Sequence, residues 1–385
     1  MVSHTDALAS EHPPLRRGRP PQARASNADT SIGGGELARN AVASLIVNIK
    51  IFCTLGPASL QPAVIEELDR RGVHLFRINL SHTQLEDVER TIDLVRRYSA
   101  LPICLDSEGP QVRCGVVQSE ALLAEGETVR LTSDSVVGSA RELTLRPASV
   151  FSSLRVDASV SLDFDGALLR VADVGDGEAT ARVTRSGLVR SNKAVTVDPP
   201  PVLPALSEKD LGAIRIGSAM GILDYALSFA GSADDVSRLR GLTPEGAHII
   251  AKIESRLGVK RMDEIVAASD SVLIDRGDLS RDVPLEVVPY YQKAIVRRAN
   301  RWNRPVFVAT NLLESMVQSR LPTVAEANDI ANTLLDGVHG LVLAAETAIG
   351  RDPVRAVDMV MRAIKAFERI NDTQLLEREP VLTSA

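Results

Sequence analysis

Short apolar runs recur along the chain, each rich in β-branched residues and each followed by a polar tip. Between them lie segments with helical periodicity, such as QPAVIEELDRRG (61–72) and VKRMDEIVAAS (259–269). There are eight runs: NIKIFCTLG (48–56), VHLFRINLS (73–81), LPICLDSEG (101–109), ILDYALSFA (222–230), HIIAKIES (248–255), SVLIDRGD (271–278), PVFVATNLL (305–313) and GLVLAAET (340–347). Continuous apolar runs suit strands that are buried on both faces, so the pattern predicts an α/β fold, a (β/α)8 TIM barrel of parallel strands.

One connection breaks this alternation, the long stretch between the third and fourth runs. Segments such as SVSLDFDGALLRVADVG alternate apolar and polar residues between Gly and Asp turns, which is typical of antiparallel strands. We therefore expect a small all-β domain inserted in the third βα loop. The expected division is a tail over 1–40, a barrel over 41–114 and 201–371, an inserted β-barrel domain over 115–200, and a second tail over 372–385.

Composition narrows the function. The net charge of −6 and the 3% aromatic content give no electrostatic or stacking case for nucleic acid, and no apolar run is long enough to span a membrane. The start of the chain lacks the features of a secretory signal, so we expect a cytoplasmic protein acting on small molecules. The three cysteines, Cys53, Cys104 and Cys114, lie in strand-like stretches without metal-like spacing, and we expect buried free thiols.

The carboxyl ends of the predicted strands carry many polar residues. In a barrel of this kind the active site is built from those ends. The residues there are Thr54, Arg77, Asn79, Ser81, Asp106, Ser107, Ser228, Phe229, Lys252, Glu254, Arg276, Asp278, Thr310 and Glu346. A solvated rim would account for one or two of them, but acids, bases and amides at strand after strand favour a functional site.

Two acidic residues from adjacent strands, Glu254 and Asp278, would converge there. Two hard oxygen ligands with open positions are the usual way in which proteins hold Mg²⁺ for phosphoryl transfer. Lys252 is two residues from Glu254, so the two should point the same way, and Arg77 and Arg113 add further cations. The set predicts electrostatic stabilisation of a transferring phosphoryl group rather than covalent catalysis.

Other chemistries find less support. His82 follows a strand end, but a lone histidine is more often structural than a ligand contact. Neither a GxGxxG nor a GxxxxGK[ST] phosphate loop is present, so the sequence does not indicate a Rossmann or P-loop nucleotide site.

The order of the polar motifs resembles one family. CTLGPAS (53–59), RINLSH (77–82), LDSEGPQVR (105–113), LSEKD (206–210), AKIES (251–255), DRGDLS (275–280), ATNLLESM (309–316), PTVAEANDIAN (322–332) and ETAIG (346–350) are similar to the motifs of pyruvate kinases. The resemblance runs from about residue 48 to 370. It implies a barrel whose inserted β domain closes over the site as a lid. It also implies phosphoryl transfer between phosphoenolpyruvate and ADP, with Mg²⁺ or Mn²⁺ and usually K⁺.

The resemblance also implies roles for individual residues. Lys252 would neutralise the transferring phosphoryl group, Arg77 would bind it, and Thr310 would lie near the enolate carbon that takes up a proton. The implied Mg²⁺ ligands are Glu254 and Asp278, and the implied K⁺ ligands are Asn79, Ser81, Asp106 and Ser107. Substrate contacts would include Ser228 and the segment Arg276, Gly277 and Asp278, whose backbone N–H groups would hold a carboxylate. The ATP or ADP contacts would be Pro57, Asn79, His82, Arg113 and Lys193.

The chain departs from the family pattern at several positions. Asp275 stands where the family has Ala, beside the expected carboxylate-binding backbone, and an extra carboxylate there would repel an anionic substrate unless it points outward or pairs with Arg276. Ser280 replaces a Gly, and Gln111 stands at a position that bears on the K⁺ requirement. The family's regulatory C-terminal domain has no counterpart in this sequence, so any homo-oligomer is expected to form through the barrel.

Three functions stay open at this point. The first is a Mg²⁺-dependent phosphotransferase of the pyruvate kinase type. The second keeps the fold and the metal but acts on a different enol phosphate or 2-keto acid, including carbon–carbon lyase chemistry. The third is an inactive paralogue with a regulatory role.

Overall fold

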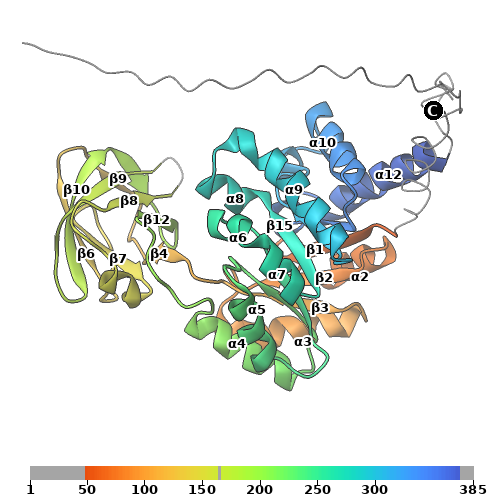
Figure 1. The fold of residues 1–385 in the computed structure, drawn as a ribbon, viewed down its shortest axis with the longest axis horizontal. Coiled ribbons are helices and arrows are strands. Elements are labelled where there is room, and N and C mark those ends of the chain that lie inside the picture. The colour runs from red at the N-terminus through yellow and green to blue at the C-terminus, as the bar shows by residue number, and fades with distance from the viewer. Residues whose placement is uncertain (1–47, 164–165, 373–385) are drawn as a thin grey trace, which may run out of the picture. The chain divides into compact units, whose positions relative to one another are not determined.

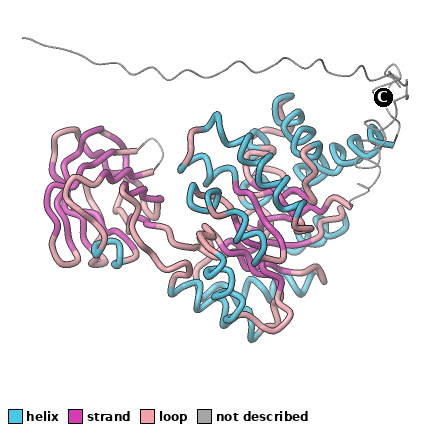
Figure 2. The backbone as a smooth tube through the Cα atoms, in the orientation of Figure 1, coloured by secondary structure: helices cyan, strands magenta, loops and turns pink. Residues whose placement is uncertain are grey.

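The computed structural model describes residues 48–163 and 166–372. Eight parallel strands close into a barrel in the order β1-β17-β16-β15-β14-β13-β3-β2 (Figures 1 and 2). The strands are β1 (Lys50–Leu55), β2 (Leu75–Asn79), β3 (Ile103–Asp106), β13 (Asp224–Leu227), β14 (His248–Lys252), β15 (Ser271–Asp275), β16 (Val306–Ala309) and β17 (Gly340–Leu343). This confirms the predicted (β/α)8 barrel.

Helices follow the barrel strands and surround them (Figure 2). They are α2 (Pro62–Arg70), α3 (Val88–Tyr98), α4 (Glu208–Ala219), α5 (Ala233–Leu242), α6 (Arg256–Lys260), α7 (Met262–Ala268), α8 (Arg276–Asp282), α9 (Val288–Arg301), α10 (Val324–Leu335), α11 (Ala345–Ala348) and α12 (Pro353–Asp372), with 3-10 turns η1 (Leu85–Asp87), η3 (Leu285–Val287) and η4 (Glu314–Val317). Helix α4 begins with a capping box in which Ser207 and Asp210 satisfy each other's backbone N–H groups. Asp210 also accepts hydrogen bonds from the N–H groups of Glu108 and Gly109, which fixes the loop after β3.

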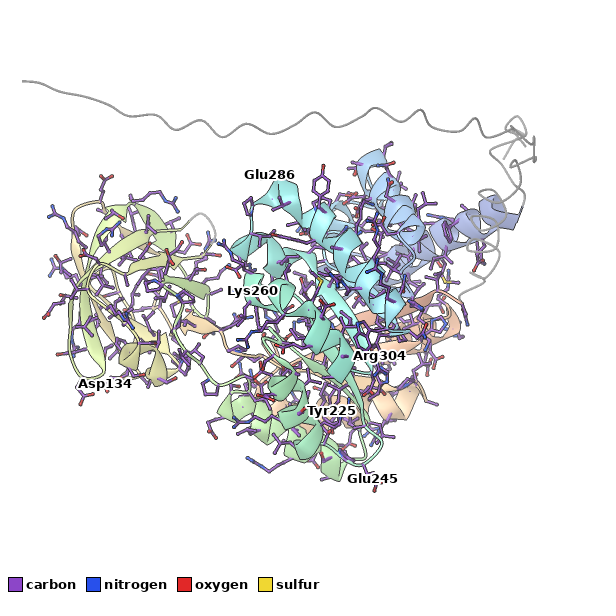
Figure 3. All side chains as sticks on the ribbon, viewed as in Figure 1. Asp134, Tyr225, Glu245, Lys260, Glu286 and Arg304 are labelled. Atoms are coloured by element: carbon purple, nitrogen blue, oxygen red, sulfur yellow. The ribbon has the colours of Figure 1, made fainter. Side chains whose placement is uncertain are left out.

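The barrel has two apolar layers. Inside it, side chains from every strand pack together, and the rings of Phe52 and Phe307 lie 4.5 Å apart. A larger core lies between the strands and the helices, and it includes the buried side chain of Tyr225, whereas Glu245 points outward into solvent (Figure 3). Both faces of each strand are therefore buried, as the continuous apolar runs required.

The connection after β3 forms a second closed barrel in the order β10-β6-β7-β4-β12-β8-β9, with a separate pair β11-β5. Its strands are β4 (Val112–Cys114), β5 (Ala121–Leu123), β6 (Thr128–Thr132), β7 (Glu142–Arg146), β8 (Ser159–Leu162), β9 (Leu168–Val174), β10 (Glu178–Arg185), β11 (Gly187–Val189) and β12 (Ala194–Asp198), with one 3-10 turn, η2 (Ala148–Ser152). Pairing is antiparallel except between β6 and β7. The inserted all-β unit is thus present, and its first strand, β4, precedes residue 115.

Other features of the chain can be compared with the expectations. Cys53, Cys104 and Cys114 are buried and free, as expected. Among the described residues, no helix combines the length and the apolarity needed to span a bilayer. The expected tail over 1–40 and residues 373–385 of the second expected tail lie outside the described residues.

Candidate active site

The carboxyl ends of the barrel strands bring together an unusual number of buried polar side chains. Those with less than a tenth of their surface exposed are Thr54, Arg77, Asp106, Ser107, Ser228, Lys252, Glu254, Asp275, Arg276 and Glu346. Buried ionic groups need partners, because an isolated charge loses far more solvation than the protein interior returns. The hydrogen bonds and ion pairs among them therefore define the site.

Lys252 ends β14 and is 4% exposed. Its Nζ donates to Ser228 Oγ at 3.0 Å and lies 3.1 Å from Glu254 Oε2, 3.4 Å from Asp106 Oδ2 and 3.9 Å from Asp275 Oδ2. Burial alone would lower the pKa of Lys252, but these three carboxylates raise it above its ordinary value. Lys252 and Glu254 thus do point the same way, and the ammonium keeps its positive charge.

Arg77 lies on β2 and is also buried. Its Nε donates to Thr54 Oγ1 at 2.8 Å, and its Nη1 pairs with Asp106 Oδ2 at 2.6 Å. Strand β2 pairs with β1 on one side and with β3 on the other. Thr54 lies opposite Arg77, and Asp106 lies opposite Asn79, so the strand register brings Thr54, Arg77 and Asp106 close together. Asp106 therefore bridges the two buried cations, Arg77 and Lys252.

Three carboxylates form a compact group next to Lys252. Glu254, Asp275 and Asp278 each offer an oxygen, and these atoms lie within 4.8 Å of one another. Glu254 Oε1 accepts a hydrogen bond from Phe229 N at 2.7 Å, whereas the buried Oε2 receives none, although Lys252 Nζ lies near it. Burial and the neighbouring acids Asp278 and Asp275 raise the pKa of Glu254 well above its ordinary value, although Lys252 opposes this.

The residues present fit a divalent cation. Burial, and then the neighbouring acids, raise the pKa values of Glu254 and Asp278, so the group carries more negative charge than the Lys252 ammonium, 3.1 Å from Glu254 Oε2, offsets. Oxygen ligands from carboxylates, with further positions left for substrate and water, suit Mg²⁺ or Mn²⁺. Glu254, Asp278 and Asp275 would hold that ion.

Asp275, which the sequence marked as a departure from the family pattern but not as a ligand, lies within this group of acids. Its Oδ1 accepts hydrogen bonds from Gly277 N at 3.2 Å and Asp278 N at 3.4 Å, and Thr310 Oγ1 lies 2.6 Å away as a third donor. The side chain neither points outward nor pairs with Arg276, the two arrangements that the sequence suggested. Burial alone would raise the pKa of Asp275, but Lys252, the Thr310 hydroxyl and Arg77 hold it below its ordinary value.

Arg276 holds the neighbouring loop. Its Nε and Nη2 donate to Thr310 O at 3.1 and 2.8 Å, Nη2 also donates to Asn311 O at 3.0 Å, and Nη1 pairs with Asp329 at 2.8 Å. Thr310 and Asn311 have φ angles of 65° and 55°, a conformation that is strained for a β-branched residue such as Thr310. The Arg276 side chain is therefore used to fix the loop that carries Thr310.

The four residues expected to bind K⁺ lie at the ends of β2 and β3. Asn79 Oδ1 accepts from Ser81 N at 2.9 Å, and Ser107 Oγ accepts from Ser228 N at 2.9 Å. Asp106 uses both oxygens, one toward Arg77 and Lys252 and the other toward Ser228 Oγ at 3.2 Å. These oxygens thus already serve the internal hydrogen-bond network.

The residues expected to contact the nucleotide lie in two places. Pro57 and His82 are exposed and follow β1 and β2. Arg113 lies on β4 of the small barrel, where it donates to Gln111 Oε1 at 2.6 Å and Asn192 O at 3.0 Å, and its Nε is buried without a hydrogen bond. Lys193, next to Asn192, pairs with Asp163 at 3.1 Å.

Comparison with known proteins gives one consistent result. A family model described as pyruvate kinase, barrel domain, matches residues 46–357. The pyruvate kinase of Methylorubrum extorquens is 38% identical over 351 residues, which cover 87% of this chain and 73% of that relative. That of Chlamydia trachomatis serovar D is 34% identical, covering 85% of this chain and 70% of the relative, and that of Thermotoga maritima is 31% identical, covering 83% and 71%.

Proposed function

This chain belongs to the pyruvate kinase family of phosphotransferases, and from that premise we propose that it transfers a phosphoryl group between phosphoenolpyruvate and ADP with the help of Mg²⁺ or Mn²⁺. The observation that carries the proposal is the group of three carboxylates within 4.8 Å of one another beside a buried, charged ammonium. A bound Mg²⁺ would act as a Lewis acid on the phosphoryl oxygens.

Lys252 and Arg77 supply positive charge toward the transferring group. Both are buried, so their charges act through little solvent and are worth more than the same charges at the surface. Asp106 fixes them in place, because its Oδ2 pairs with both. Preorganised cations of this kind stabilise a phosphoryl-transfer transition state without moving during the reaction.

Thr310 is suited to hold a proton beside the substrate carbon. Its hydroxyl accepts from Gly277 N at 2.9 Å, and its oxygen lies 2.6 Å from both Asp275 Oδ1 and Ala309 O. On the nucleotide side, we propose contacts to ADP from Pro57, Asn79, His82, Arg113 and Lys193, and K⁺ binding by Asn79, Ser81, Asp106 and Ser107.

A coupled assay tests this function directly. Phosphoenolpyruvate and ADP are mixed with the full chain and Mg²⁺ or Mn²⁺, with and without K⁺, and pyruvate formation is followed with lactate dehydrogenase. Activity well above that of a Lys252→Met variant is expected. The proposal fails if the wild-type protein is no faster than this variant under every metal condition.

Asp275 favours a second candidate, an enzyme with the same fold and metal but a different enol phosphate or 2-keto acid as substrate. Its carboxylate lies inside the site, within 4.8 Å of the other two acids, and not on the outer surface. An Asp275→Ala variant separates the candidates, because a rise in affinity for phosphoenolpyruvate would mean that the wild-type site is shaped for another substrate.

A further inference from the structure

The carboxylate of Asp275 occupies hydrogen-bond donors that face the candidate cation site. Two backbone N–H groups, of Gly277 and Asp278, and the hydroxyl of Thr310 converge on its Oδ1. The Asp275 residue is 5% exposed, so the donors that bind its side chain are enclosed and not directed into bulk water. A carboxylate brought by a substrate would find them already used.

Asp275 also changes the charge of the site. Three buried acids, Asp106, Glu254 and Asp275, face two buried cations, Lys252 and Arg77, so there is one acid more than there are cations to pair with. Without Asp275 the same groups would balance. Asp278 adds little to the negative charge of the site, because it pairs with Arg281 at 2.8 Å.

A second observation indicates that the acidic group has an oxygen available to a cation. Glu254 is fully buried and belongs to the group of three acids, and its Oε2 receives no hydrogen bond, only the ion pair with Lys252 Nζ at 3.1 Å. When a divalent cation is bound there, the site that contains Asp275 presents one positive charge fewer to a substrate than a site that lacks Asp275. The donors already bonded to Asp275 and the negative charge of Asp275 therefore both weaken the binding of an acidic substrate group at this point.

We propose that Asp275 is a specificity-determining residue: its carboxylate takes, from within the protein, the place beside the cation that an acidic group of the substrate would otherwise occupy. The site then binds a substrate carboxylate at this point, that of phosphoenolpyruvate included, more weakly than the same site with Ala at position 275 would. This inference rests on the proposed metal-dependent phosphoryl transfer.

Binding of two probes, measured by calorimetry on the full chain, tests the proposal. The first probe is Mn²⁺ alone, which Asp275→Ala should bind about tenfold more weakly, because one ligand is lost. The second is oxalate at saturating Mn²⁺, which the same variant should bind at least about tenfold more tightly, because the donors are released and one negative charge is removed. Shifts of opposite sign cannot come from a variant that is merely damaged.

Asp275→Asn is the matched control. It removes the charge but keeps an oxygen that accepts from Gly277 and Asp278, so it should bind Mn²⁺ more weakly and gain less affinity for oxalate than Asp275→Ala does. Methyl phosphate, which has no carboxylate, should gain less than oxalate in Asp275→Ala. The proposal is overturned if Asp275→Ala leaves oxalate affinity unchanged or weaker, or if oxalate and methyl phosphate gain equally.

The result is separable from the test of the reaction itself. If the opposite shifts are found but neither wild type nor Asp275→Ala converts phosphoenolpyruvate, the role of Asp275 stands and the proposed reaction does not. If wild type converts phosphoenolpyruvate and the Asp275→Ala substitution leaves oxalate affinity unchanged, the proposed reaction stands and the role of Asp275 does not.

Discussion

Individual charges in this site act through their burial. Lys252, 4% exposed, lies within 4 Å of three carboxylates, and its raised pKa means that it stays an ammonium throughout the working pH range. An exposed ion pair of the same composition would contribute little, because water and salt would screen it. Its buried position, more than its chemical identity, suits Lys252 to the proposed role of electrostatic catalyst.

Replacing Lys252 by Met should slow kcat by several orders of magnitude. The loss of a principal buried cation corresponds to roughly 4–6 kcal/mol of transition-state stabilisation. Steady-state kinetics in the coupled assay measures this, with circular dichroism to confirm that the variant is folded. A folded variant within about tenfold of wild type would show that Lys252 is not part of the catalytic machinery.

Arg276 is predicted to act by positioning Thr310. Arg276→Lys cannot donate to both Thr310 O and Asn311 O through a planar fork, so the strained loop should relax. We expect kcat to fall by roughly 10–100-fold with little change in Mn²⁺ affinity, because the hydrogen bonds of the Arg276 side chain go to Thr310 O, Asn311 O and Asp329. Asp329→Asn, which weakens the anchor of Arg276, should give a smaller effect in the same direction. A parallel loss of Mn²⁺ binding would contradict the positioning role.

The sequence was enough to predict which residues lie at the carboxyl ends of the barrel strands, but not the direction in which their side chains point. Lys252, Glu254, Asp278 and Arg77 were expected at the barrel mouth because their strands end there. Asp275 was expected to be a liability, because no pattern in the sequence tells whether a carboxylate at a strand end points outward or turns back onto the next residues' N–H groups. The hydrogen bonds of Arg276 to Thr310 O likewise depend on a backbone conformation that only the folded loop has.

At the scale of elements, two histidines support the amino-terminal ends of the barrel strands. His74 Nδ1 accepts from Ile51 N on β1 at 3.1 Å, and His339 Nδ1 accepts from Val306 N on β16 at 3.3 Å. Burial, and secondly Lys50, lower the pKa of both imidazoles. An imidazole whose Nδ1 accepts a hydrogen bond must be unprotonated at that nitrogen.

This arrangement predicts the direction of a pH effect on stability. With the folded pKa lowered, the stabilisation is present above the ordinary histidine pKa of about 6.5 and is lost as the pH falls through the folded value. Urea unfolding at about pH 7.5 and about pH 5 should show a smaller loss of stability for a His74→Gln, His339→Gln double variant than for wild type. An equal or larger loss in the double variant would rule out these histidines as the cause.

Closure of the barrel depends on a glycine in β17. A Cβ at Gly340 would lie 2.4 Å from Lys50 O on β1 and 2.8 Å from the Phe307 ring on β16. Gly340→Ala should therefore lower the free energy of unfolding by roughly 1–3 kcal/mol or more, since both strands must shift.

Gly241 near the end of α5 provides the matched control, because a Cβ there meets no atom within 4 Å. Gly241→Ala should leave stability unchanged or raise it by up to about 1 kcal/mol through helix propensity. If both variants unfold at the same urea concentration as wild type, the close approach at Gly340 has no energetic consequence.

At the scale of the whole molecule, most of the fold could be predicted from the periodicity of apolar and polar residues. The alternation of eight apolar runs with helical segments is directly readable as a parallel barrel, and the change to strand-like alternation marks the inserted β unit. The closed order of that unit, with its parallel pair β6-β7, could not be predicted, because a short alternating strand is compatible with several partners. The proposed cation site depends on the pairing of β14 with β15, because the three acids lie at and just beyond the carboxyl ends of these two strands.

The proposed function requires one divalent cation held by Glu254, Asp275 and Asp278 beside Lys252. The most direct measurement is anomalous diffraction from crystals of the full chain soaked in Mn²⁺. We expect one strong anomalous peak between the three carboxylates, roughly 2 Å from an oxygen of each. A peak elsewhere on the chain, or none among these side chains at saturating Mn²⁺, would contradict it.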